Sequence, residues 1–119
     1  DYARKAEFID VFNYYKGLIE LRKSHIAFRQ RTAEDIRKKL TFLPSPRKMV
    51  AFVLKDEKDP WKEILVIYNG DTKDQQFTLP DGTWNVVVDK DNAGTKVLYQ
   101  VSGKINIKAI SAMVMYKGN

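Results

Sequence analysis

The first part of the chain has the apolar spacing of one face of an α-helix. Its apolar side chains fall at the i, i+3, i+4, i+7 positions, at Phe8, Val11, Phe12, Tyr15, Leu18 and Ile19. This spacing predicts an amphipathic helix from about Ala6 to Ser24, whose apolar stripe has to be buried. No second long helix follows it in the sequence. We therefore expect the partner of this stripe to lie outside the chain, which would then be a piece of a larger protein.

Beyond Leu40 the pattern changes to short apolar runs separated by turns. Strands are predicted at residues 41–43, 50–54, 63–68, 75–79, 84–88, 97–101, 104–107 and 112–116. About eight short strands at this spacing are typical of an antiparallel β-sandwich. The predicted fold class is mainly β, with one amphipathic helix and a short second helix before the strands. Thr32 and Asp35 have the form of a capping box for that second helix.

Three local signals refine the strand pattern. Pro80-Asp81-Gly82 predicts a turn, because Pro presets φ and Gly tolerates a positive φ. Ser102-Gly103 predicts a hairpin between the strands on either side. In the run from Trp84 to Val88, alternation places Trp84, Val86 and Val88 on one face.

The run from Ile64 to Tyr68 is apolar at every position. A strand with one solvated face alternates apolar and polar residues, so this run predicts a strand buried on both faces. The other sheet of the sandwich would cover one face. The amphipathic helix or a domain outside the chain would have to cover the other.

Composition and charge narrow the classes of function. The formal net charge is +6, but the basic residues are scattered among acidic ones, which disfavours a nucleic-acid surface. Cys is absent, which excludes disulfides and thiolate metal sites. No apolar run approaches the ~18 residues of a membrane span, and neither end resembles a signal peptide. These features leave the compartment undecided.

Few residues suggest catalytic chemistry. His25, the only histidine, follows the predicted helix, where a cation is favoured structurally. Carboxylates gather at Asp56, Glu57 and Asp59 and at Asp89 and Asp91, and both groups are interpreted as solvated turns. The segment from Asp89 to Gly94 departs from a calcium-binding EF-hand loop at Ala93 and Gln100. We assign no catalytic, carbohydrate-binding or metal-binding residue and expect no cofactor.

The sequence predicts different degrees of burial for the two tryptophans. Trp84 shares a face with valines, which predicts packing in the core. Trp61 follows Pro60 at the edge of a loop and is predicted to be exposed. It is therefore the one aromatic residue that we would test for contact with carbohydrate.

Several segments resemble the type I pullulanases of glycoside hydrolase family 13. Residues 11–25, with the sequence VFNYYKGLIELRKSH, and Ala27-Phe28-Arg29 are similar to the final helix of the catalytic barrel in this family. Residues 32–44 resemble the junction into the C-terminal domain, and residues 61–69 and 79–88 resemble strands of that domain. Ile26 departs from the family pattern, which usually has Pro after this histidine.

The resemblance implies that residues 1–30 are the final helix of a truncated (β/α)8 barrel and residues 31–119 a C-terminal β-sandwich domain. It implies a parent enzyme that hydrolyses α-1,6 linkages of α-glucans by a retaining mechanism. Its catalytic carboxylates would lie upstream of this chain, and the sandwich would stabilise the barrel.

Two alternatives remain open, a stand-alone carbohydrate-binding module and the C-terminal domain of an isoamylase or branching enzyme. The expected partners are the barrel of the same polypeptide and, for the parent, its α-glucan substrate. We also expect the isolated chain to self-associate through Phe8, Phe12, Tyr15 and Ile19.

Overall fold

The computed structural model describes residues 13–14, 16–25 and 38–118 of the 119-residue chain. Residues 13–14 and 16–24 are helical, so the helix ends at Ser24 as predicted. The described residues form eight strands: β1 (Leu40–Phe42), β2 (Met49–Lys55), β3 (Glu63–Asn69), β4 (Gln75–Thr78), β5 (Trp84–Val88), β6 (Tyr99–Val101), β7 (Lys104–Ile107) and β8 (Ser111–Lys117). The predicted capping box at Thr32 and Asp35 lies outside the described residues, although residues 38–39 are helical.

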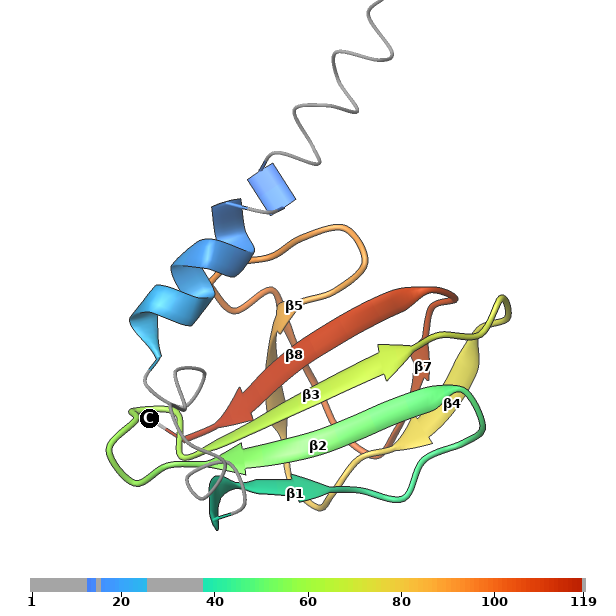
Figure 1. Ribbon diagram of the computed structural model, residues 1–119, viewed down its shortest axis with the longest axis horizontal. Coiled ribbons are helices and arrows are strands. Elements are labelled where there is room, and N and C mark those ends of the chain that lie inside the picture. Colours follow the sequence, from blue (N-terminus) through green and yellow to red (C-terminus); the bar gives the residue numbers. More distant parts are fainter. Residues whose placement is uncertain (1–12, 15, 26–37, 119) are drawn as a thin grey trace, which may run out of the picture.

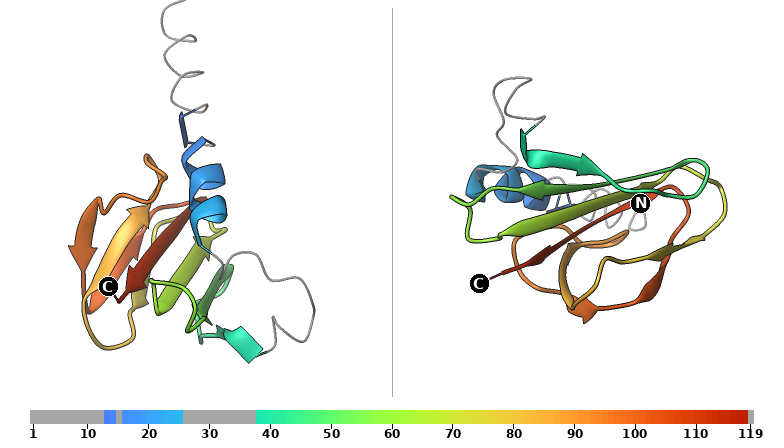
Figure 2. Two further views of the ribbon diagram at one scale, coloured as in Figure 1. Left: turned by 90° about the vertical axis from the view of Figure 1, so that its left-hand side faces the viewer. Right: turned by 90° about the horizontal axis from the view of Figure 1, so that it is seen from below.

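The strands form two antiparallel sheets. The larger sheet has six strands in the order β1-β2-β3-β8-β5-β6, and the smaller one pairs β4 with β7. The helix lies on one face of the six-stranded sheet and the β4–β7 pair on the other (Figures 1 and 2). This arrangement confirms the predicted mainly β fold with a preceding helix. None of the described helical residues forms a helix long and apolar enough to span a membrane.

The inner core fills the space between the two sheets. It is built from alternate residues of the strands, whose side chains point to one face of each strand. Its buried members are Met49, Ala51, Val53, Leu65, Ile67, Phe77, Leu79, Trp84, Val86, Ile107, Met113 and Met115. Trp84 is among them with 1% of its surface exposed, which confirms its predicted place in the core.

A second cluster lies on the outer face of the larger sheet, beneath the helix. It contains Leu21, Leu54, Trp61, Ile64, Val87, Val88 and Val114, with Tyr14 and Leu18 of the helix packed against it. β3 thus contributes Leu65 and Ile67 to the inner core and Ile64 to this outer cluster. Burial on both faces is confirmed from Ile64 to Ile67, whereas Tyr68 is 45% exposed.

The face that the helix turns toward the sheet differs from the predicted stripe. Tyr14, Leu18 and Leu21 pack on the outer cluster of the same chain. Of these three only Leu18 belongs to the predicted stripe, so the expectation of a partner outside the chain is wrong for Leu18. Ile19 is 56% exposed. The stripe residues Phe8, Phe12 and Tyr15 lie outside the described residues. Within the described stretch the helix therefore has apolar residues on two sides.

The predicted hairpin at Ser102-Gly103 is wrong. β6 pairs with β5, and β7 pairs with β4, so this turn carries the chain from one sheet to the other. Gly103 has a φ of 73°, and its carbonyl accepts the Leu79 N–H at 2.8 Å. The turn chemistry was identified correctly, because Gly is suited to positive φ. The strand partners are chosen by packing between distant segments.

The shared face of β5 is also interrupted. The pairing of β5 with β8 shifts between Val86 and Val88, as at a β-bulge. A bulge adds one residue to a strand and reverses the side-chain alternation beyond it. Val86 therefore joins Trp84 in the inner core, whereas Val88 points to the outer cluster beside Val87. The prediction that Val88 shares the Trp84 face is wrong for this reason.

Candidate functional site at the helix junction

Three rings stack where the helix ends on the sheet. The His25 ring lies on Trp61 with centroids 3.5 Å apart, and Trp61 lies on Tyr116 at 4.0 Å with an interplanar angle of 4°. Trp61 is only 7% exposed. The prediction that Trp61 is exposed is wrong, because the end of the helix and β8 cover its two faces. It therefore cannot serve as a free platform for a sugar ring.

Asp59 fixes the histidine of this stack. His25 Nδ1 lies 2.7 Å from Asp59 Oδ1, and the same oxygen accepts the Trp61 backbone N–H at 2.9 Å. Asp59 is fully buried and His25 is 6% exposed. A buried carboxylate needs such partners to offset its loss of hydration. The pair ties His25, the residue that follows the helix, to the loop between β2 and β3.

The acidic residues of this loop are not a solvated cluster. Asp56 is 4% exposed, with Oδ1 accepting the Lys58 N–H at 2.9 Å and Oδ2 accepting Lys39 Nζ at 3.0 Å. The prediction of solvated turn residues is therefore wrong for Asp56 and Asp59 and holds for Glu57, which is exposed. Backbone N–H groups and a lysine make burial of these carboxylates favourable.

The loop after β5 holds the helix from another side. Tyr14 Oη donates to the Asp89 carbonyl at 2.9 Å, and Thr95 Oγ1 donates to Glu20 Oε1 at 2.9 Å. Between these contacts the loop passes against Gly17, where an added Cβ would lie 1.9 Å from the Ala93 carbonyl oxygen. Only a residue without a side chain permits this approach.

Asp89 organises that loop internally. Its Oδ1 accepts the backbone N–H groups of Asp91 and Asn92, each at 2.9 Å, and its Oδ2 accepts Tyr99 Oη at 3.0 Å. Both oxygens of this carboxylate are engaged in holding the turn. This is the local hydrogen bonding by which Asp favours turns.

The Tyr99 phenol gives this loop a pH dependence. Burial, together with the hydrogen bond to Asp89 and its charge, raises the pKa of Tyr99 from 10.0 to about 12. The unfolded chain then releases this proton at lower pH than the folded chain, so stability is expected to fall as the pH rises from 10 to 12. Tyr99→Phe should remove this part of the alkaline loss. Denaturant unfolding at stepped pH measures this effect. A variant whose free energy of unfolding falls as steeply between pH 10 and 12 as that of the unsubstituted chain would contradict the prediction.

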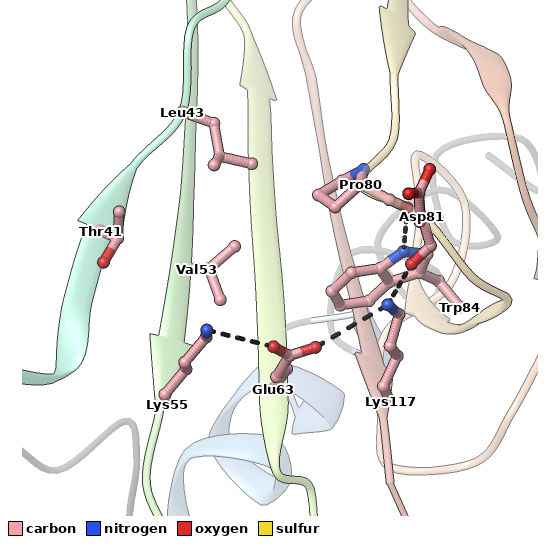
Figure 3. Close-up of a pocket in the computed structure, with 9 residues that line it drawn as sticks. All are labelled: Thr41, Leu43, Val53, Lys55, Glu63, Pro80, Asp81, Trp84 and Lys117. Atoms are coloured by element: carbon pink, nitrogen blue, oxygen red, sulfur yellow. Dashed lines mark hydrogen bonds and ion pairs between the residues drawn. The ribbon is translucent and has the colours of Figure 1, made fainter.

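A pocket of about 310 Å³ opens on the inner side of the larger sheet, at the same end of β2, β3 and β8 as the helix junction (Figure 3). Its apolar wall comes from Leu43, Val53, Pro80 and Trp84, and its charged residues are Lys55, Glu63, Asp81 and Lys117. Glu63 pairs with Lys55 at 3.3 Å and with Lys117 at 3.9 Å. The pocket thus has a mixed lining whose charges largely compensate one another.

Trp84 lines the pocket although only 1% of its surface is exposed. Its Nε1 donates to the Pro80 carbonyl at 3.0 Å, and Lys117 Nζ lies 4.6 Å from the ring centroid. Lys117 also donates to the Asp81 carbonyl. The lysine covers the indole as a cation–π contact. Pro80 and Lys117 thus hold the indole in the wall of the pocket.

Comparison with known proteins places these features in a family. Residues 36–92 match the family model of the pullulanase all-beta domain. Over 83 residues the chain is 37% identical to a pullulanase of Bacillus subtilis (strain 168), covering 68% of this chain and 12% of that protein. The chain contains a pullulanase all-beta domain.

Two solved pullulanases extend the similarity of this pullulanase domain to almost the whole chain. The pullulanase from Bacillus acidopullulyticus matches 98% of the chain with a TM-score of 0.87 and 44% identity. The type I pullulanase from Bacillus subtilis str. 168, complexed with maltose, matches 100% with a TM-score of 0.83 and 28% identity. The chain spans only 15% and 17% of these two structures.

The junction residues of the pullulanase domain were only partly visible in the sequence. His25 was noted as the only histidine, but Asp59 lies 34 positions away and carried no signal of its own. The signal that identifies Gly17 is a glycine inside an otherwise helical pattern, which often marks a close approach of backbone. The pairing of Trp61 with Tyr116 had no sequence signal.

Proposed function

We propose that this chain is the non-catalytic C-terminal part of a pullulanase-like enzyme that hydrolyses α-1,6 linkages of α-glucans, and that it stabilises the catalytic barrel. The observation that carries the proposal is the helix with apolar residues on two sides. One side packs on the sandwich through Tyr14, Leu18 and Leu21. Ile19, on another side, is 56% exposed.

A helix of this kind suits a position between two bodies. A helix that is apolar on more than one side is normally enclosed by protein. Its sequence resembles the final barrel helix of the pullulanases, which supports the barrel as the second body. The residues that would complete the barrel-facing stripe include Phe8 and Phe12, which lie outside the described residues.

The contacts at the helix junction support a rigid attachment. The buried His25–Asp59 pair and the stack on Trp61 hold the end of the helix. The approach of the Ala93 carbonyl at Gly17 and the bond from Thr95 to Glu20 hold its middle. A helix held in this way keeps a fixed position on the sandwich, and so would stabilise the barrel that packs against its other side.

The alternative of a stand-alone carbohydrate-binding module finds less support. Such modules present accessible aromatic rings beside hydrogen-bonding groups. Trp61 and Trp84 are both buried. The similar structures described above are pullulanases, which favours that family over the alternative of an isoamylase or branching-enzyme domain.

A chimera tests the proposal. This chain would replace the matching segment of the Bacillus acidopullulyticus pullulanase, and reducing ends released from pullulan would be measured. We expect the chimera to hydrolyse pullulan and to inactivate at higher temperature than the same enzyme truncated before the segment. We expect the isolated chain to release no reducing ends and to bind malto-oligosaccharides no better than millimolar, about −4 kcal/mol. Micromolar binding by the isolated chain would favour the carbohydrate-binding module instead.

A further inference from the structure

The side chain of Asn69 links the two sheets at the end of β3 that lies far from the helix junction (Figure 1). It is fully buried. Its Nδ2 donates to the carbonyl oxygens of Lys73 at 3.0 Å, Ile107 at 3.1 Å and Lys108 at 3.3 Å. Asn69 belongs to the larger sheet, whereas Lys73 precedes β4 and Ile107 ends β7 in the smaller one. The amide therefore fastens one sheet to the other.

The surroundings of this side chain require a donor at Nδ2. The amino group offers two hydrogen atoms to the three carbonyl oxygens, while Oδ1 accepts the Asp71 backbone N–H at 3.0 Å. A carboxylate of the same shape would place an oxygen against those carbonyl oxygens with no hydrogen atom between them. Burying a charge in such a place is strongly unfavourable. The fold of this end of the domain therefore depends on the amide form of Asn69.

Glycine follows this asparagine, and Asn69-Gly70 is the only Asn-Gly pair in the sequence. The backbone nitrogen of the residue after an asparagine can attack the side-chain carbonyl carbon and close a succinimide ring. Glycine has no Cβ to hinder that attack. Asn85, Asn92 and Asn106 precede Val, Ala and Ile, which are larger. The least hindered amide of the chain thus stands where the fold requires an amide.

The folded structure blocks the attack. The Gly70 N–H donates to the Lys48 carbonyl at 2.8 Å, so the attacking nitrogen is engaged. Pairing with β2 and β8 holds Asn69 in the extended backbone of a strand. The Ile110 N–H donates to the Asp71 carbonyl at 3.1 Å and joins the turn after β7 to the turn after β3. Attack therefore requires the turn between β3 and β4 to open, and its rate follows the population of the open form.

We propose that Asn69 is a deamidation site that the fold protects, and that its conversion makes unfolding of this domain irreversible. In the open turn the Gly70 nitrogen forms a bond to Asn69 Cγ, the Cγ–Nδ2 bond breaks, and Nδ2 leaves as ammonia with the Gly70 proton. Water then opens the succinimide to aspartate or isoaspartate, without any change of oxidation state. Both products carry a carboxylate, and isoaspartate also lengthens the backbone at the end of β3. The inference does not depend on the proposed function.

Peptide mapping of the isolated chain by mass spectrometry tests the protection. The chain is incubated in mildly alkaline buffer, with and without guanidinium chloride at an unfolding concentration. We expect Asn69 to lose its amide at least about tenfold more slowly in the folded chain than in denaturant. Asn106 is the control within the chain, because it is exposed but followed by the branched Ile107, and it should stay largely unconverted in both. Equal rates at Asn69 in both conditions, or an Asn69 that keeps its amide in denaturant, would overturn the proposal.

Refolding tests the consequence of the conversion. After incubation in denaturant, the fraction in which only Asn69 has changed is separated from the unconverted fraction, and both are returned to buffer. The unconverted fraction should refold. The converted fraction should unfold at lower denaturant concentration or fail to refold, with faster hydrogen exchange of residues 69–75 and 105–111. A converted fraction that refolds with the same unfolding midpoint as the unconverted one would overturn the proposal.

A substitution in the turn tests whether its opening controls the rate. Asp71 Oδ2 accepts Gln75 Nε2 at 2.7 Å, and Oδ1 accepts the Lys73 N–H at 3.3 Å. Asp71→Ala should raise the rate of conversion in the folded chain about fivefold, the effect of losing one typical hydrogen bond. Asp81→Ala, at an exposed aspartate in the turn between β4 and β5, is the matched control and should leave the rate unchanged.

Equal rates of Asn69 conversion in both folded variants and the unsubstituted chain would overturn control by this turn. If Asp71→Ala does not fold, the comparison of the unsubstituted chain in buffer and in denaturant decides the matter.

Discussion

The Trp61→Ala variant is expected to lose about 3–5 kcal/mol of its free energy of unfolding, the cost typical of removing a buried large aromatic side chain. Trp61 is 7% exposed and lies between the rings of His25 and Tyr116. Its removal leaves a cavity at the junction and takes a stacking partner from each ring. The end of the helix should detach with it, because the His25–Asp59 pair would then be open to water.

Urea unfolding of the isolated chain measures this loss. The control is Tyr68→Ala, which removes an aromatic side chain that is 45% exposed and should change the free energy of unfolding by less than about 1 kcal/mol. Affinity for malto-oligosaccharides should not change in either variant. An unchanged free energy of unfolding together with a lost affinity for sugar would contradict the structural role of Trp61 and show that it is a binding residue.

The second large effect is expected for Gly17→Ala. The added Cβ would lie 1.9 Å from the carbonyl oxygen of Ala93, so the loop from Asp89 to Val97 would have to move away from the helix. Overpacking of this kind costs about 1–3 kcal/mol or more. The gain in helix propensity from Gly to Ala, about 1 kcal/mol, opposes it. We expect the contact to dominate, because the oxygen belongs to backbone and cannot rotate aside.

Gly94→Ala is the matched control for that substitution. Among the residues that the structure describes, none has a heavy atom within 4 Å of a Cβ added at Gly94, on the same loop. Its free energy of unfolding should stay the same or rise by about 0.4–1 kcal/mol, because alanine restricts the unfolded chain. Hydrogen exchange of residues 89–97 should rise in the Gly17 variant alone. A Gly17→Ala protein as stable as the unsubstituted chain, with unchanged exchange, would refute the close packing of loop and helix.

Local periodicity determined most of the secondary structure. The eight strands, the end of the helix at Ser24 and the burial of Ile64 to Ile67 follow from spacings of a few residues, which the sequence displays directly. The resemblance of residues 11–25 to a pullulanase helix, also local, led to the correct family. The turn predicted from the adjacent residues Pro80-Asp81-Gly82 is also confirmed, since Gly82 has a φ of 108°.

Tertiary contacts decided the helix junction and the faces of the sheet. Trp61 looked exposed because its neighbours are polar, but His25 and Tyr116 reach it from positions 36 and 55 residues away. Asp56 and Asp59 looked solvated because nothing in their own segment shows Lys39 or His25 beside them. The bulge at Val88 and the sheet change at Gly103 arise from pairing with distant strands. Such pairings are set by how the whole core packs, and side chains brought together from distant positions leave no period in the sequence for a local pattern to reveal.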